Sequence, residues 1–258
     1  MKSKSPFPIP TEIEGLFRML KMNSACERYR AIWAEPKYES WSFDEKLELM
    51  LREEVNARSE RRTLRHLQHS GLKESEAFHS ADLNNLINRS GRNINIDLLN
   101  RLGTCAWIHN EPPSNLMISG ATGTGKTWIV TALGKAACHA GISTYYYRVP
   151  KLLEIMQDAY DHHRSSELRV KINRNKLLIL DDFGMGTLSQ EVATDLLSLL
   201  VDRVGFASTI VAGQLDPSEW YGYIGNDHTA EALIDRLVNT SYRITLQGKS
   251  LREGQAPT

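Results

Sequence analysis

The chain has 258 residues, its 31 Lys plus Arg are balanced by 31 Asp plus Glu, and 41% of its residues are hydrophobic. This composition argues against a disordered chain and predicts one large domain, or a medium domain with a smaller companion. Because the net charge is zero, binding to nucleic acid or lipid would have to come from local clusters of charge. The three cysteines are widely spaced and no signal sequence is seen, so we expect a cytoplasmic protein. No apolar run is long enough to span a membrane, so we expect no membrane insertion.

Residues 1–75 are predicted to form a small helical domain, since they contain few glycines and show no strand pattern. The first helix carries apolar residues on one face: Ile13, Leu16, Phe17 and Leu20. Glu35 and Pro36 interrupt this pattern, and a second helix starts at Ser42, because Ser42 and Glu45 have the spacing of a capping box. We expect the second helix to bury Leu47, Leu51 and Val55.

Residues 99–258 show short apolar strands that alternate with amphipathic helices, after a polar stretch over 76–98 that predicts a linker. The predicted strands are 116–119, 143–147, 177–180, 209–212 and 242–246. The predicted helices between them are 127–140, 151–162, 190–204 and 230–239. Such alternation predicts an α/β fold, a doubly wound parallel sheet of five strands with helices on both faces.

A glycine-rich loop follows the first predicted strand and opens the first of these helices. Residues 120–127 match the P-loop pattern G-x-x-x-x-G-K-[ST] in the context that the pattern requires. Backbone N–H groups of such a loop surround a phosphate, the lysine reaches the terminal phosphates, and the threonine hydroxyl ligates magnesium. The predicted site for ATP and Mg2+ therefore comprises Gly120, Ala121, Thr122, Gly123, Thr124, Gly125, Lys126, Thr127 and Trp128.

Two adjacent acids end the third predicted strand. Burying carboxylates there costs free energy, so their presence suggests a functional role. We predict that Asp181 anchors the metal together with Thr127, and that Asp182 orients or deprotonates an attacking water. Because Asp is shorter than Glu, a slow ATPase is expected. The alternative is a pair of acids in an ordinary turn.

An extra strand and helix over 143–163 separate the P-loop from these acids in the sequence. Lys126 and Asp181 are therefore expected on strands that are not consecutive, as in motor and switch ATPases. Gln214 ends the fourth predicted strand, where its amide either reaches the γ-phosphate or the water, or simply faces solvent.

These residues resemble a family, the IstB-like ATPases of insertion-sequence transposition, which are relatives of the DnaC helicase loaders within the AAA+ class. In the ATPase core the resemblance rests on residues 120–127, 177–184, 235–237 and 244–252. In the N-terminal region it rests on residues 41–47, 53–54 and 61–62. One departure is Gly213, which with Ala212 replaces a more usual Thr-Ser pair. The resemblance implies a P-loop AAA+ fold with a small N-terminal helical domain and no C-terminal lid domain.

The resemblance also implies roles for single residues. It makes Gln214 the polar sensor, Arg236 the arginine finger and Arg252 the second sensor arginine. An arginine finger from a neighbouring subunit implies a homo-oligomer whose ATP sites lie between protomers. From the residues alone, Arg236 reads as a surface arginine paired with Asp235 or Glu231.

Charge is balanced over the whole chain but not over residues 161–176, where five basic residues accompany two acids. The basic residues are Arg164, Arg169, Lys171, Arg174 and Lys176. The resemblance implies that this segment binds DNA, and phosphate contacts from Lys and Arg would make the binding independent of sequence and sensitive to salt. An ordinary solvated loop is the alternative. The arginine-rich helix over 52–65 is a second candidate, although its glutamates can form intrahelical pairs instead.

We therefore expect an ATP-dependent, DNA-binding regulator of transposition. It oligomerises on duplex target DNA, recruits or activates a cognate transposase, and is released by ATP hydrolysis. A DnaC-like replicative helicase loader is the main alternative on the same fold. A third possibility is an ATP-gated adaptor in which Asp182 and Arg236 no longer support turnover.

Overall fold

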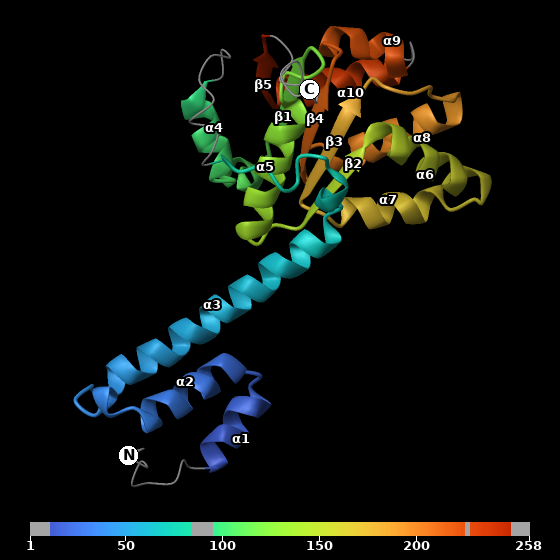
Figure 1. Cartoon of the computed structure of the whole chain (residues 1–258). Helices are drawn as coiled ribbons and strands as arrows, with labels where there is room; N and C mark the ends of the chain where they lie inside the picture. Colours follow the sequence, from blue (N-terminus) through green and yellow to red (C-terminus); the bar gives the residue numbers. More distant parts are fainter. Residues whose placement is uncertain (1–10, 84–94, 225–227, 249–258) are drawn as a thin grey trace, which may run out of the picture. The chain divides into compact units, whose positions relative to one another are not determined.

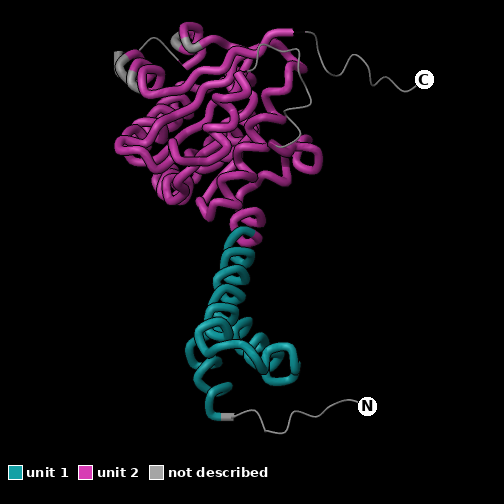
Figure 2. The backbone as a smooth tube through the Cα atoms, turned by 90° about the vertical axis from the view of Figure 1, so that its left-hand side faces the viewer, with its two compact units in different colours: residues 1–63 teal, residues 64–258 magenta. Residues whose placement is uncertain are grey.

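The polypeptide divides into two units, residues 1–63 and residues 64–258, coloured separately in Figure 2. A computed structural model describes residues 11–83, 95–224 and 228–248. The long helix α3 (Phe43–His69) runs across the boundary and belongs to both units. Among the described residues, no helix combines the length and the apolar character that crossing a membrane requires.

Unit 1 contains short helices and the first part of α3. They are α1 (Thr11–Met19), α2 (Asn23–Ala34) and the 3-10 turn η1 (Pro36–Tyr38). The predicted break at Pro36 is confirmed, but the chain also turns between α1 and α2, where Lys21 adopts a left-handed conformation with φ 55°. The capping box is confirmed as well: the N–H of Ser42 donates to Oε2 of Glu45 at 2.7 Å, and the N–H of Glu45 donates to Oγ of Ser42 at 3.3 Å.

The buried face of α3 in unit 1 is not the predicted one. Three apolar residues that we expected to be buried are 37%, 45% and 64% exposed: Leu47, Leu51 and Val55. Instead, α3 buries Met50 and Glu54. The Glu54 carboxylate accepts the N–H groups of Ser24 and Ala25, at 3.0 and 3.2 Å, and satisfies donors that the first turn of α2 leaves free. Capping α2 in this way turns the Glu54 side of α3 inward and leaves the neighbouring apolar face in solvent.

Unit 2 is built on a five-stranded parallel sheet, as predicted. The strands are β1 (Asn115–Gly120), β2 (Thr144–Arg148), β3 (Leu177–Phe183), β4 (Ser208–Gly213) and β5 (Ser241–Leu246). Their order in the sheet is β2-β3-β4-β1-β5, and every neighbouring pair is parallel. Thus β4 lies between the strand that precedes the P-loop and the strand that ends in the two acids. These two strands, which are not consecutive in the sequence, are therefore not neighbours in the sheet either.

Helices cover both faces of the sheet (Figure 1). They are α4 (Ile96–Gly103), α5 (Lys126–His139), α6 (Val149–Asp161), α7 (Ser165–Asn173), α8 (Gln190–Arg203), α9 (Trp220–Ile224) and α10 (His228–Asn239), with 3-10 turns η2 (Leu72–Glu74), η4 (Ala106–His109) and η5 (Pro217–Glu219). Side chains of β3 alternate between two hydrophobic cores: Leu177 and Ile179 join the core with α5, whereas Leu178 and Leu180 join the core with α6 and α8. This two-faced core is the α/β fold expected from the sequence.

The start of unit 2 differs from the predicted domain limits at 75 and 98. Residues 70–83 pack on the α/β core: Leu72 and Ala81 are fully buried in the core with α5. The carbonyl oxygen of Ser70 accepts the N–H of Tyr146 at 2.6 Å, which ties this segment to β2. Small apolar residues in a polar stretch give little periodic signal, which is why the sequence pattern suggested a linker. Residues 84–94 of that predicted linker lie outside the described part of the chain.

Candidate functional site: a phosphate loop beside two acids

The P-loop takes its shape from glycines in conformations that other residues avoid. Gly120, Gly123 and Gly125 have φ values of 150°, 78° and 100°. At Gly120 a Cβ atom would also lie 2.5 Å from the carbonyl oxygen of Leu246 on the neighbouring β5. The loop therefore holds its backbone close to the sheet edge and leads directly into α5 at Lys126.

Lys126 lies inside this loop rather than on the surface. Its side chain is 8% exposed, and Nζ donates to the carbonyl oxygens of Gly120 at 2.7 Å and Ala121 at 2.9 Å. Burial lowers the pKa of the ammonium, and the nearby charges of Asp181 and Asp182 act in the opposite direction. The structure thus brings the predicted lysine and both predicted acids within electrostatic reach of each other.

Asp181 is buried and surrounded by hydrogen-bond donors. It is 1% exposed, its Oδ2 accepts the hydroxyl of Tyr146 at 2.9 Å, and its Oδ1 accepts the N–H of Asp182 at 3.0 Å. Burial raises the pKa of this carboxyl, and the charge of Asp182 adds to that effect. Hydrogen bonds from Thr127 and Tyr146 lower the pKa in turn. Thr127 and Asp181, the predicted metal ligands, therefore lie together.

Asp182 has a strained backbone and a cationic partner. Its φ is 57°, a left-handed value that costs energy for a residue with a side chain. Its Oδ2 accepts Nε of Arg148 at 2.9 Å and forms an ion pair with Nη2 of the same guanidinium at 2.8 Å. Asp181 and Asp182 lie in the last residues of β3, just before the turn at Gly184, and are together called the acid turn here.

Two residues of this site, Tyr146 and Arg148, were not predicted from the sequence. Both belong to β2, which pairs with β3 so that Arg148 stands opposite Asp181 in the register. The proximity of Tyr146 and Arg148 to the two acids follows only from the strand order, because 28 residues separate β2 from β3 in the sequence. The triple tyrosine 145–147 was predicted to place at least one ring in the core, and Tyr146 is 1% exposed.

Gln214 directly follows β4 and so lies at the same edge of the sheet as the P-loop and the acid turn. Its side chain is exposed, and Nε2 lies 3.9 Å from Sδ of Met185. Gly213 precedes it for a steric reason, since a Cβ there would lie 2.3 Å from the carbonyl oxygen of Phe183. The glycine that departs from the family pattern is therefore required by the close approach of β4 to β3.

Three other predicted nucleotide-site residues are placed differently or not at all. The side chain of Trp128 is buried in the core, and its Nε1 donates to the carbonyl oxygen of Ser80 at 3.2 Å, so the ring points away from the loop. Arg236 lies on α10, but its side chain is outside the described part, as is all of Arg252.

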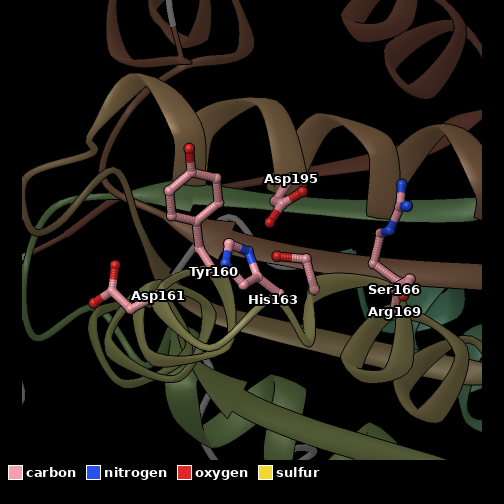
Figure 3. Close-up of a pocket in the computed structure, with 7 residues that line it drawn as sticks. Tyr160, Asp161, His163, Ser166, Arg169 and Asp195 are labelled. Carbon is pink, nitrogen blue, oxygen red and sulfur yellow. The ribbon is translucent and has the colours of Figure 1, made fainter.

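The basic segment 161–176 is largely the helix α7, not a loop, and its basic residues do not share one face. Arg169 helps to line a hollow of about 660 Å³, and its side chain reaches from α7 toward α8, which carries Asp195 (Figure 3). Arg164 pairs with Asp158 at 3.1 Å. Lys171 and Arg174, three residues apart, are exposed, and Lys176 is exposed just beyond the helix. Among the described residues, these last three form no ion pair, whereas Arg164 does; DNA binding by the five residues stays a prediction.

The residues at this edge of the sheet fit ATP and Mg2+. The first N–H groups of α5 have no intrahelical partners, and with the loop N–H groups they form a typical phosphate cradle. One buried carboxylate and one hydroxyl suit magnesium, which keeps several waters and takes other ligands from phosphates. The described residues contain no cluster of three or more His, Cys, Asp or Glu that could hold a metal ion.

Comparison with known proteins supports ATP as the nucleotide. The family described as IstB-like ATP binding protein matches residues 15–257. The insertion-sequence ATP-binding protein y4pL of Sinorhizobium fredii is 37% identical over 84% of this chain and 86% of its own length. The ATP-binding protein of insertion sequence IS1162 from Pseudomonas fluorescens is 35% identical over 77% of this chain and 84% of its own length.

Among solved structures, the DnaC helicase loader shares the fold. Its TM-score is 0.53 with 18% sequence identity, over 67% of this chain and 99% of that chain. The structural match shows a shared fold, whereas the family match extends over both units. The chain therefore belongs to the family of IstB-like ATP-binding proteins.

Proposed function

We propose that this protein is an ATP-hydrolysing helper of insertion-sequence transposition. ATP drives protomers into an oligomer on duplex DNA, the oligomer recruits the cognate transposase, and hydrolysis releases it. The observation that carries the proposal is the P-loop with its buried Lys126 at the same edge of the sheet as the buried carboxylate of Asp181. The names of its relatives, ATP-binding proteins of insertion sequences, point to the biological setting.

In this proposal the P-loop and the acid turn bind and orient the nucleotide. The loop N–H groups and Lys126 hold the phosphates, and Thr127 with Asp181 would hold Mg2+, which neutralises phosphate charge when bound. Asp182 accepts a hydrogen bond from the attacking water and takes up its proton. Gln214 positions that water from the end of β4.

The proposed oligomer follows from the role given to Arg236. In this role the guanidinium enters the ATP site of the neighbouring protomer and stabilises charge in the transition state. Each protomer then supplies the phosphate loop of one site and the arginine of the next. Hydrolysis is slow in the monomer and faster in the assembled form.

Replacing the loop lysine tests the nucleotide half of the proposal. Lys126→Ala removes the ammonium group that the proposal places on the terminal phosphates, so binding of a fluorescent ATP analogue should be lost. The matched control is Lys151→Ala, an exposed lysine that pairs with Glu154. ATP-dependent assembly on DNA by Lys126→Ala at the wild-type level would contradict the mechanism.

Reversing charge on α7 tests the DNA half. Lys171→Glu with Arg174→Glu should weaken binding to duplex DNA of any sequence and flatten its dependence on salt, because counterion release scales with phosphate contacts. The control is Lys73→Glu with Arg101→Glu, two exposed residues elsewhere on unit 2. Unchanged affinity of the α7 variant would remove this helix from the DNA surface.

A helicase loader is the second candidate, and the observation that favours it is the shared fold with DnaC. A loader would assemble on single-stranded DNA and act on a replicative helicase. Comparing ATP-dependent assembly on duplex and single-stranded DNA of equal length separates the two functions. Preference for duplex DNA supports transposition, and preference for single-stranded DNA supports the loader.

A further inference from the structure

The exposed face of α3 in unit 1 carries a regular pattern whose apolar centre is covered neither by the ATP site nor by the rest of unit 1. Residues separated alternately by four and three positions lie along one side of a helix, the spacing of a coiled-coil seam. On α3 this row is occupied in turn by two acids, two apolar residues and two arginines. The seam comprises Asp44, Glu48, Leu51, Val55, Arg58 and Arg62.

Every residue of this seam is exposed in unit 1. Leu51 and Val55, at its centre, are 45% and 64% exposed, although apolar residues at seam spacing are normally covered. The acids and arginines of the seam are exposed too. α2 does not cover it, because the contacts to α2 come from the face of α3 that holds Met50 and Glu54.

The charges along the seam are complementary to those of a second copy that runs in the opposite direction. If a second α3 lies antiparallel with Leu51 opposite Val55, then Asp44 stands opposite Arg62 and Glu48 stands opposite Arg58. The two-fold axis repeats each of these contacts, which is the property of an isologous interface. A parallel partner would instead place acid against acid and arginine against arginine.

We propose that α3 pairs with the α3 helix of a second copy of this chain in an antiparallel, two-fold arrangement along this seam. The interface does not need ATP and is distinct from the nucleotide-dependent contacts of the proposed oligomer. It joins two protomers through unit 1, and ATP then links such pairs through unit 2.

The composition of unit 1 supports this pairing. Its own core is a small cluster of buried apolar side chains: Ala25, Tyr29, Ile32, Tyr38 and Met50. Units of this size seldom gain enough stability from one small core and are often completed by oligomerisation. Covering Leu51 and Val55 at the centre of the seam would add buried apolar surface to a unit whose own core is small.

The end contacts of the seam allow a clean test, because neither Asp44 nor Arg62 forms an ion pair within the described part of the chain. Arg58, in contrast, donates from Nε to the buried Glu54 at 2.8 Å, and its replacement would disturb unit 1 itself. The variants are Asp44→Arg, Arg62→Asp and the double variant. The matched control is Glu60→Arg, an exposed acid on the far side of α3.

The measurement is sedimentation of the full chain without nucleotide over a range of concentrations. Wild type and Glu60→Arg should form dimers, and each single seam variant should dissociate at least about tenfold more readily, since it places like charges together twice. Dimerisation should return in the double variant and in an equimolar mixture of the two single variants. Monomeric wild type, or a double variant no better than the single ones, overturns the proposal.

Cross-linking tests the orientation independently of affinity. All three native cysteines are buried, so introduced thiols at the seam are the accessible ones. A mixture of Leu51→Cys and Val55→Cys should form a mixed disulfide dimer, whereas each variant alone should not. Disulfide dimers of each single variant alone would show parallel pairing and contradict the proposal. ATP binding, followed with the fluorescent analogue, should be unchanged in all these variants, which separates failure here from failure of the nucleotide site.

Discussion

The guanidinium of Arg148 holds the carboxylate of Asp182 through two contacts, from Nε at 2.9 Å and from Nη2 at 2.8 Å, both to Oδ2. Asp182 raises the pKa of Arg148, chiefly through this hydrogen bond. Arg148 also occupies the N-cap position of α6, the helix that leads to α7 and its exposed basic residues. Arg148 therefore contacts the proposed catalytic acid, Asp182, and begins the helix that precedes α7.

Removing this guanidinium should raise basal ATP hydrolysis. Arg148→Ala frees the Oδ2 atom of Asp182 to accept a hydrogen bond from water. Because the ion pair with Arg148 is partly exposed, it is worth up to about 1 kcal/mol, or about fivefold in rate. Arg148→Lys keeps the positive charge but cannot form both contacts, so its rate of ATP hydrolysis should lie between those of wild type and Arg148→Ala. Steady-state phosphate release measures the rates, and a rate in Arg148→Ala at or below that of wild type would contradict the restraining role.

Tyr146→Phe should destabilise unit 2 without changing its shape. The substitution removes the hydroxyl that donates to Oδ2 of Asp181 at 2.9 Å and leaves a buried acceptor unsatisfied, at a cost of about 1–3 kcal/mol. Tyr160→Phe, at a ring that is 45% exposed, is the control and should change stability by less than about 0.5 kcal/mol. Urea unfolding compares the two. Equal stability of both variants would mean that the Tyr146 hydroxyl does not support Asp181.

Much of this architecture could be predicted from the sequence because its signals are local. The P-loop pattern, the apolar strand before the acid turn and the capping box at Ser42 each depend on residues that are close in the chain, and the structure places them as expected. The alternation of strands and helices similarly indicated the doubly wound sheet.

The remainder depends on contacts between distant segments. Arg148 reaches Asp182 only because β2 and β3 are neighbours in the sheet, and the apolar row of α3 stays exposed only because Glu54 caps α2 on another face. Trp128 follows the P-loop in sequence, yet its ring is drawn into the core by the segment around Ser80. Periodicity within one segment contains no information on such partners.

Gly213→Ser should damage the acid turn more than the P-loop. A Cβ at this position would lie 2.3 Å from the carbonyl oxygen of Phe183, which directly follows Asp182, so β3 must shift. We expect a decrease of about 1–3 kcal/mol in stability from overpacking, and a larger relative decrease in hydrolysis than in nucleotide binding. Gly222→Ser, where nothing lies within 4 Å of an added Cβ, is the control. Full hydrolysis by Gly213→Ser would show that the close approach of the strands is dispensable.

Arg203 should be one of the largest single contributors to the stability of unit 2. It is 1% exposed, burial lowers its pKa to about 10, and its guanidinium donates to Oγ1 of Thr209 at 3.1 Å and to the carbonyl oxygens of Asn175 at 3.0 Å and Ser208 at 2.7 Å. Arg203→Ala leaves these acceptors unpaired and opens a cavity, which should lower stability by about 3 kcal/mol or more. A lysine in Arg203→Lys cannot reach all three of these acceptors, so it should restore only part of the lost free energy of unfolding. Unfolding by urea gives both values, and a difference below about 1 kcal/mol from wild type in Arg203→Ala would refute this role.

Mixing two inactive variants tests whether Arg236 acts between protomers. Lys126→Ala cannot bind nucleotide but still presents Arg236 to its neighbour, whereas Arg236→Ala binds nucleotide but lacks the finger. Neither variant alone should hydrolyse ATP at more than a small fraction of the wild-type rate, since removal of an arginine finger costs about 10³-fold or more. In a mixture, an Arg236→Ala protomer beside a Lys126→Ala protomer regains a complete site, so activity should appear and should peak near equal amounts. A mixture as inactive as its components, under conditions where sedimentation shows mixed oligomers, would mean that Arg236 does not complete the ATP site of a neighbour.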